Sequence, residues 1–214
     1  MDLRIRNLVI QFPGMSKPLL EIEDRAISPG SRLLIRGPSG TGKTSLLHIM
    51  AGLLDPHRGE VAVNGTQVGR LSEGERCAWR RESVGLVFQR LNLLGHLTAL
   101  ENVLLGSPGA SGSREKALAA LKRLGVDQLV HTLAYNLSLG EQQRVAVARV
   151  TARAPRLILA DEPTSSLDAA NAQSVVEALL ETAGKNGTLI VATHDDRVQS
   201  HFSEIWTLEG GRIR

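Results

Sequence analysis

Residues 37–44, Gly37-Pro38-Ser39-Gly40-Thr41-Gly42-Lys43-Thr44, decide the fold of this chain. They match G-x-x-x-x-G-K-[S/T], a phosphate-binding loop that needs a strand before it and a helix after it. Residues 32–36 are apolar enough to form the strand, and residues 44–54 carry apolar side chains at helical spacing. The glycines let backbone N–H groups turn toward phosphate oxygens, and the start of the helix adds its positive end. We therefore expect residues 37–45, including Ser45, to bind the phosphates of a nucleotide.

Two side chains of this loop are suited to nucleotide chemistry. Lys43 can reach the β- and γ-phosphates, and the Thr44 hydroxyl can ligate Mg²⁺. The expected ligands are therefore a nucleoside triphosphate and Mg²⁺.

A pair of carboxylates follows a second buried strand. Residues 157–160 are apolar and lead directly into Asp161 and Glu162. Ligands of parallel sheets bind at the carboxyl ends of the strands, so Asp161 is expected at the Mg²⁺ site. Glu162 is the candidate general base for the water that attacks the γ-phosphate. An acidic pair at this place can also cap a helix that begins at residues 163–164.

The composition limits the class of protein. Of 214 residues, 42% are hydrophobic and 22% charged, which excludes wholesale disorder. Lys and Arg total 25 against 22 Asp and Glu, and this net charge of +3 is too small to indicate a nucleic-acid surface. Aromatic residues make up only 3%, so the core must be aliphatic and stacking platforms for single strands are not expected. We expect no nucleic-acid partner.

Targeting signals are not evident in the sequence. Cys77 is the single cysteine, which excludes an internal disulfide and leaves secretion unsupported. The N-terminal residues lack the apolar run of a signal peptide, and no stretch of about 18 apolar residues could span a bilayer. These features predict a cytoplasmic protein.

Strand and helix signals alternate along the chain and predict an α/β fold with a mostly parallel sheet. The expected strands are residues 3–10, 19–27, 32–36, 84–88, 157–160 and 188–193, with hairpins at 60–68 and 204–214. The expected helices are 44–54, several short ones within 97–131, and then 139–152 and 169–182, with a surface loop at 107–113. The N-terminal strands form an antiparallel portion. We expect one domain, 1–214, with core segments 1–89 and 155–214 and a helical subdomain inserted at about 90–154.

Further motifs, taken in order, carry a family resemblance. Residues 137–144 read Leu-Ser-Leu-Gly-Glu-Gln-Gln-Arg, and residues 165–168 read Ser-Ser-Leu-Asp. With the phosphate loop, the acidic strand end, Phe12, Gln89 and His194, their order resembles the ATP-binding subunits of ABC transporters. The resemblance covers essentially the whole chain.

The resemblance implies that the nucleotide is ATP, and it implies roles for residues around the chain's own nucleotide. Phe12 would stack on adenine, although a Phe at a strand end is often a core residue. Gln89 would touch Mg²⁺ and the attacking water, and His194 would hydrogen-bond the γ-phosphate. Together with Glu162, Gln89 and His194 form the expected catalytic set.

The resemblance also implies contacts across a dimer. Ser138, Gly140, Glu141 and Asp168 would serve the nucleotide held by the opposite protomer. Leu139 departs from the glycine that the family usually has at this place. We expect a negative φ at Leu139 and a side chain that points away from the phosphate, because Ser138 and Gly140 are retained.

The implied function is that of an ATP-hydrolysing subunit whose ATP-driven dimer closure powers an integral membrane permease. Residues 88–103 resemble the corresponding segment of lipoprotein-releasing and macrolide-export ATPases, with the cell-division ATPase as a cousin. The leucines after Gln89 would form the surface that docks a helix of the membrane partner. The protein would then lie on the inner face of the cell membrane.

Two other functions compete with this interpretation. A soluble ABC ATPase acting on nucleic acid or ribosomes typically has tandem domains or a coiled-coil insertion, and this sequence has neither. A small-molecule kinase shares the phosphate loop but has no use for residues 137–144 or Glu162. Neither alternative accounts for all of the motifs.

Overall fold

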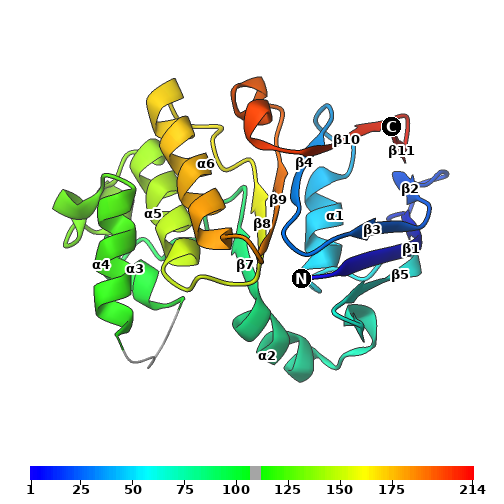
Figure 1. Cartoon of the computed structure of the whole chain (residues 1–214), viewed down its shortest axis with the longest axis horizontal. Helices are drawn as coiled ribbons and strands as arrows, with labels where there is room; N and C mark the ends of the chain where they lie inside the picture. Colours follow the sequence, from blue (N-terminus) through cyan, green and yellow to red (C-terminus); the bar gives the residue numbers. More distant parts are fainter. Residues whose placement is uncertain (107–111) are drawn as a thin grey trace.

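The computed structural model describes residues 1–106 and 112–214, and at its centre is a six-stranded sheet with the order β11-β10-β4-β9-β8-β7 (Figure 1). Its strands are β4 (Arg32–Arg36), β7 (Val84–Val87), β8 (Leu157–Asp161), β9 (Thr188–Ala192), β10 (Glu204–Glu209) and β11 (Arg212–Ile213). Neighbouring strands pair in parallel except for the antiparallel hairpin of β10 and β11. The predicted mostly parallel sheet and terminal hairpin are confirmed.

The register of the central strands brings three strand ends to one edge of the sheet. Ala192 of β9 pairs with both Ile35 of β4 and Asp161 of β8. The loop that begins at Gly37 follows β4, and Glu162 follows β8. Because these strands are parallel, the glycine-rich loop and both carboxylates emerge at the same edge.

A second, antiparallel sheet contains the N-terminal residues. It consists of β1 (Leu3–Ile10), β2 (Leu20–Ile22), β3 (Arg25–Ile27), β5 (Arg58–Val63) and β6 (Thr66–Gln67). The single extended stretch expected over 19–27 is two short strands, separated by Glu23 and Asp24. The expected hairpin turn is present: Asn64 and Gly65 have φ values of 50° and 80°, as a two-residue type I′ turn requires.

Apolar side chains pack against both faces of the central sheet. Helix α1 (Lys43–Met50) lies between the two sheets, where Leu46 and Leu47 belong to one core (Figure 1). Helices α5 (Leu139–Thr151) and α6 (Ala169–Ala183) cover the other face, where Val145 and Val175 belong to a second core. Nearly all of the buried apolar side chains are aliphatic, as the composition predicts.

Helix α1 ends earlier than the helix predicted over residues 44–54. Ala51 caps it, and Gly52 follows with a φ of 64° and donates its N–H to the Ile49 carbonyl at 3.0 Å. A glycine in the left-handed region after the last turn is a common helix terminator. Residues 51–54 therefore form a turn.

Helix α2 (Glu73–Ser83) was not expected from the sequence pattern. None of its residues is buried, and Cys77, Ala78 and Trp79 are consecutive instead of recurring once per turn. The one sequence feature that indicates this helix is the capping box at its start. The Ser72 side chain accepts from the Glu75 backbone N–H, and the Glu75 side chain accepts from the Ser72 backbone N–H.

Short helices occupy residues 97–131 as expected. They are α3 (Ala99–Leu104), α4 (Ser113–Arg123) and the 3₁₀ turn η2 (Asp127–Leu129); other 3₁₀ turns are η1 (Val68–Arg70), η3 (Ala134–Asn136) and η4 (Asp196–His201). Residues 107–111 of the expected loop lie outside the described residues. Within the described ranges, no helix has both the length and the apolar character needed to cross a membrane.

Gly85 of β7 provides a test of how closely α5 packs on the sheet. A Cβ there would lie 2.5 Å from Pro155 Cγ and 2.6 Å from Val150 Cγ1. We expect Gly85→Ala to lower the free energy of unfolding by about 1–3 kcal/mol, because overpacked cores are strained. Gly74→Ala, on exposed α2 with nothing within 4 Å of its Cβ, is the matched control. Urea denaturation of both variants measures the difference; equal stability would contradict the close packing.

Candidate active site

The loop between β4 and α1 presents backbone N–H groups to an open space. Gly40 (φ 81°) and Gly42 (φ 96°) have left-handed torsions that residues with a side chain rarely adopt. Across the described residues, the N–H groups from Gly42 to Ser45 have no acceptor, and the first helical bond runs from Leu46 N–H to the Gly42 carbonyl at 2.8 Å. Unpaired N–H groups at the positive end of a helix form an anion site.

Lys43 lies folded over this loop. Its Nζ donates to the carbonyls of Gly37 at 2.7 Å and Pro38 at 3.0 Å, and the residue is only 8% exposed. Neither acceptor is charged, and no carboxylate of the described residues pairs with this ammonium. A nearly buried cation that forms no ion pair favours an anionic ligand at the loop.

Thr44 and Asp161 meet at the edge of the sheet. The Thr44 hydroxyl donates to Asp161 Oδ2 at 2.6 Å, while the buried Asp161 Oδ1 has no hydrogen-bond partner among the described residues. Burial raises the pKa of Asp161, against the opposing effect of the Thr44 hydrogen bond. A hydroxyl and a carboxylate oxygen are hard ligands of the kind that Mg²⁺ takes together with substrate phosphates. The orphaned Oδ1 therefore fits a magnesium ion at this place.

Glu162 is held firmly by its neighbours. Its φ of 48° lies in the left-handed region, and its N–H donates to the Ala192 carbonyl at 2.8 Å. The Thr193 hydroxyl donates to Oε2 at 2.7 Å, and His194 Nδ1 lies 2.8 Å from Oε1. Strained backbone of this kind persists at functional sites where surrounding contacts fix it. Thr193, which no sequence signal singled out, orients this carboxylate.

A cavity of about 190 Å³ connects these groups. Its lining consists of Leu19, Ser39, Gly40, Gly42, Lys43, Thr44, Ser45, Gln89, Asp161 and Glu162. The structure thus brings Gln89 to the phosphate loop and both carboxylates, as expected for a strand-terminal glutamine here. Leu19 is an addition that the sequence did not indicate. Ligand pockets usually hold roughly 300–1,000 Å³, so one chain encloses only part of a nucleotide site.

The remaining loop residues shape the site without lining it. The Thr41 hydroxyl donates to the Pro38 carbonyl at 2.9 Å and so closes the loop on itself. A Cβ at Gly37 would lie 2.7 Å from the Leu208 carbonyl oxygen, so only glycine fits there.

Phe12 is at the surface and does not line the cavity. It is 37% exposed and belongs to a turn in which Met15 N–H donates to its carbonyl at 3.1 Å. The other arm of the same hairpin reaches the site: Leu19 N–H donates to the Ile10 carbonyl at 2.8 Å, and Leu19 lines the cavity. Phe12 is thus not a core residue.

Ser138 begins helix α5 on exposed surface. Its hydroxyl donates to Glu141 Oε2 at 2.8 Å and accepts from Glu141 N–H at 3.4 Å. The Ser138 hydroxyl lowers the pKa of Glu141. Leu139 is 60% exposed, and its φ is negative, as expected. Glu141 therefore contacts Ser138 in its own chain.

Asp168 caps helix α6. Its carboxylate accepts from Asn171 N–H at 2.8 Å and Asn171 Nδ2 at 2.7 Å, and the backbone hydrogen bond is the main reason that its pKa is lowered. Asp168 is exposed, and none of Asp168, Ser138, Gly140 or Glu141 lines the cavity. The predicted site residues therefore fall into two separate groups within one chain.

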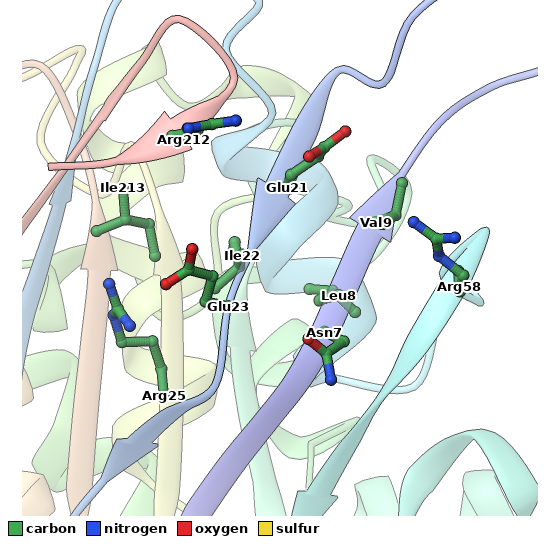
Figure 2. A pocket seen from close by; sticks show the side chains of 10 residues that line it. All are labelled: Asn7, Leu8, Val9, Glu21, Ile22, Glu23, Arg25, Arg58, Arg212 and Ile213. Carbon is green, nitrogen blue, oxygen red and sulfur yellow. The ribbon is translucent and has the colours of Figure 1, made fainter.

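A separate hollow of about 330 Å³ lies on the antiparallel sheet and β11 (Figure 2). It contains none of the predicted site residues; its lining consists of Asn7, Leu8, Val9, Glu21, Ile22, Glu23, Arg25, Arg58, Arg212 and Ile213. Its charged side chains are of both signs, so it does not favour a ligand of one charge.

Comparisons with known proteins agree on one family. The sequence model described as "ABC transporter" matches residues 23–165. The chain is 39% identical to the lipoprotein-releasing system ATP-binding protein LolD of Legionella pneumophila, over 89% of this chain and 86% of LolD. It is 36% identical to the macrolide export ATP-binding/permease protein MacB of Burkholderia pseudomallei, over 99% of this chain but 33% of MacB.

A solved structure extends the likeness to three dimensions. The dimeric bacterial ABC transporter cassette MJ0796 superposes with a TM-score of 0.90 at 34% identity, over 99% of this chain and 96% of the cassette. The same cassette is also known as a dimer in a post-hydrolysis state with ADP and phosphate, with a TM-score of 0.89.

The raised pKa of Asp161 predicts a stability cost that depends on pH. A carboxyl whose pKa is higher in the folded state costs stability above that folded value, and the cost vanishes below the unfolded value of about 3.9. We expect Asp161→Asn to raise the Tm of the ligand-free chain at pH 8, with a smaller gain at about pH 4, close to the unfolded value. The variant should also lose stabilisation by Mg-ATP. Thermal melts at both pH values test this.

Asp127→Asn is the control for Asp161→Asn, because Asp127 is an exposed carboxylate on η2. Its Tm should follow that of the unmodified chain at both pH values. An Asp161→Asn variant that is less stable at pH 8 would contradict the desolvation cost.

Proposed function

The chain belongs to the ABC transporter family as an ATP-binding, ATP-hydrolysing subunit, and we propose that two such chains close around ATP to drive a membrane partner. The observation that carries this proposal is the division of the site. The phosphate loop, Asp161 and Glu162 share one cavity, whereas Ser138 and Asp168 are exposed elsewhere on the same chain. A second chain that supplies the missing group would complete the small cavity. The dimeric state of the cassette MJ0796 supports this arrangement.

We infer the binding of ATP from the unpaired groups of the loop. The N–H groups from Gly42 to Ser45 would donate hydrogen bonds to phosphate oxygens, and Lys43 would exchange its carbonyl partners for phosphate oxygens. Phe12 is proposed to stack on adenine, because its ring is exposed on the hairpin that borders the cavity through Leu19.

Thr44, Asp161 and Gln89 are the proposed holders of magnesium. Thr44 and Asp161 already meet at 2.6 Å, and Gln89 lines the same cavity. When bound, the ion would neutralise charge on the β- and γ-phosphates.

Glu162 is proposed to take the proton of the attacking water. Thr193 occupies Oε2, so Oε1 is the oxygen that remains for the water once His194 turns away. The His194 side chain is 69% exposed and free to turn toward the γ-phosphate. This motion would convert a resting contact into a catalytic one.

The facing group acts on the nucleotide of the opposite chain. Ser138 and the N–H of Gly140 lie at the start of α5, where an anion is favoured. Asp168 approaches from the start of α6. Glu141, committed to Ser138 by its hydrogen bonds, contributes by holding that hydroxyl. We propose that residues 1–214 form one domain, with a helical subdomain at about 90–154 that includes the start of α5.

The membrane partner is proposed to dock in an apolar groove of about 420 Å³ near α2 and α3. Its lining includes Leu53, Leu86, Phe88 and Leu105. Because Phe88 directly precedes Gln89, a partner bound in the groove would contact the backbone next to Gln89. The expectation that the leucines directly after Gln89 form this surface needs correction. Leu91 is buried and Leu93 is half-buried against the core; only Leu94 is well exposed.

The groove is positively charged. Arg80, Arg81, Arg149 and Arg153 line it, and no carboxylate among the described residues does, although Arg80 pairs with Glu73 outside the lining at 2.8 Å. Arg149 and Arg153 donate to backbone carbonyls, which satisfy hydrogen bonds but leave the charge uncompensated. We infer that the docking segment combines apolar residues with carboxylates. Through this partner the protein lies at the inner face of the membrane.

The competing functions find no support. LolD and MacB are named for lipoprotein release and macrolide export, and a kinase would not share residues 137–144. We propose that this chain powers a transport system similar to those of LolD and MacB, and we assign no particular transported molecule.

Glu162→Gln tests the two-chain site. We expect hydrolysis to fall by at least about a hundredfold, since the base is lost, while ATP binding persists and traps a dimer. Size-exclusion chromatography with Mg-ATP detects that dimer. Lys43→Ala is the comparison variant, and it should lose ATP affinity and remain monomeric. A Glu162→Gln chain that binds ATP yet stays strictly monomeric would refute the proposal.

Two synthetic peptides of opposite charge test whether the arginines of the groove select an acidic partner. We expect a synthetic amphipathic helical peptide with Leu and Glu to bind at least about tenfold more tightly than its Leu and Lys counterpart, and less tightly at high salt. Leu105→Asp, at a position 49% exposed, should abolish binding, whereas Leu118→Asp on α4, at 36%, should not. Fluorescence anisotropy measures the affinities. Equal affinity for both peptides would show that the charge does not select the partner.

A further inference from the structure

Beyond the catalytic residues, Asp195 and Arg197 form an ion pair directly after His194. The guanidinium is bidentate, with Nε to Asp195 Oδ1 and Nη2 to Oδ2, both at 2.8 Å. The Asp195 side chain is only 9% exposed, and the Arg197 hydrogen bond is the main cause that lowers its pKa to about 2. Two parallel bonds to a nearly buried carboxylate fix the geometry far better than a single surface contact does.

This pair reaches toward both catalytic side chains. Asp195 N–H donates to the Thr193 hydroxyl at 3.0 Å, and that hydroxyl donates to Glu162 Oε2 at 2.7 Å. The pair thereby ties the loop that carries His194 to the general base.

The same pair also reaches the residues that face the opposite chain. Thr164, which is fully buried, donates its hydroxyl to Asp195 Oδ2 at 2.7 Å. Arg197 Nη1 and Nη2 each lie 3.3 Å from the Leu167 carbonyl, next to Asp168. Residues 164–168 are thus bonded to the Asp195 and Arg197 pair at both of their ends.

A second arginine holds the far side of this segment. Asp168 accepts from Asn171, whose Oδ1 accepts from Arg144 of α5 at 2.9 Å. A Cβ at Gly140 would lie 3.4 Å from Leu167 Cδ2, so the start of α5 packs directly on the segment. Hydrogen bonds therefore link Glu162 to the segment that ends at Asp168 and link Asp168 to Arg144 of α5, while the start of α5 is reached by packing against Leu167.

We propose that Asp195 and Arg197 are positioning residues that couple the two half-sites of one chain, the one around its own nucleotide and the one that faces the other chain's nucleotide. The inference rests on the proposed two-chain site. Closure on one nucleotide displaces Asp168, and the Arg197 fork transmits that displacement to His194 and Glu162. Neither Asp195 nor Arg197 lines the phosphate cavity, so neither is a catalytic residue.

Arg4 offers a matched control for Arg197. It also pairs with an aspartate two residues away, Asp2, at 2.9 Å, but this pair lies at the start of β1 and the Asp2 side chain is 35% exposed. A surface ion pair of that kind contributes little. Arg4→Ala therefore reports what loss of an ordinary Arg–Asp pair does to this protein.

The experiment measures the ATPase rate against ATP concentration for the full chain and for Arg197→Ala, Arg197→Lys, Thr164→Val and Arg4→Ala. The Kd of a fluorescent ATP analogue and the Tm are measured on the same samples. We expect Arg197→Ala to lower kcat at least tenfold and bring the Hill coefficient to 1, with the Kd within twofold. Arg197→Lys keeps the charge without the fork and should recover the rate only partly. Thr164→Val, which keeps Arg197, should lower the Hill coefficient in the same way.

Several results would overturn the inference. One is Arg197→Ala with a kcat and Hill coefficient within twofold of Arg4→Ala; another is a loss of rate that Arg197→Lys restores fully, since charge alone would then suffice. If Arg197→Ala does not fold, an unchanged Hill coefficient in Thr164→Val overturns it equally. Failure of the proposed function looks different: the unmodified chain itself would show a Hill coefficient of 1 and no ATP-dependent dimer.

Discussion

The hydrogen bond from Thr44 to Asp161 is the contact around which this protein is organised. It joins the first turn of α1 to the end of β8 at 2.6 Å, residues that are 117 positions apart in the chain. It exists because β4, β9 and β8 run in parallel in one register, so the glycine-rich loop and the carboxylates leave the sheet at the same edge. The cost is a buried carboxylate with one unpartnered oxygen, which a metal ion would satisfy.

Unsatisfied groups also underlie the proposal that two chains are needed to complete one site. The N–H groups at the start of α1 are unpaired, and Lys43 forms no ion pair, so both can bind phosphate. Glu162 is hydrogen-bonded to His194. Ser138 and Asp168, the groups that would enclose the phosphate, begin helices on exposed surface outside the cavity. Each is held by its own capping bonds, so a second chain would meet side chains that are already positioned. Closure can then be rigid, because little local ordering remains to oppose it.

Much of this arrangement could be predicted from the sequence, because its signals are local. Apolar runs of three or four residues mark β4, β8 and β9, and residues 37–44 mark the phosphate loop and the start of α1. The apolar pattern of the sequence does not reveal helix α2, because none of its residues is fully buried and only Trp79 packs against a core. The predicted α1 is too long because Gly52 ends the helix through its backbone torsion. The contacts of Thr193, Leu19 and Arg197 depend on tertiary packing, which no spacing rule encodes. Glu141 is a further example: the sequence groups it with Ser138 in one motif, and the structure shows that its carboxylate bonds to the Ser138 hydroxyl of the same chain.

The most direct test of the account is an ATP-dependent cross-link between two chains. One variant carries Ser39→Cys and the other Ser138→Cys, both exposed positions, each in a Cys77→Ser, Glu162→Gln background. The account predicts that the mixed variants form a disulfide-linked dimer under mild oxidation only when Mg-ATP is present. Neither variant alone should form it. A cross-link that ignores ATP, or none at all despite bound ATP, would contradict the claim that Ser138 of one chain faces the phosphate loop of another.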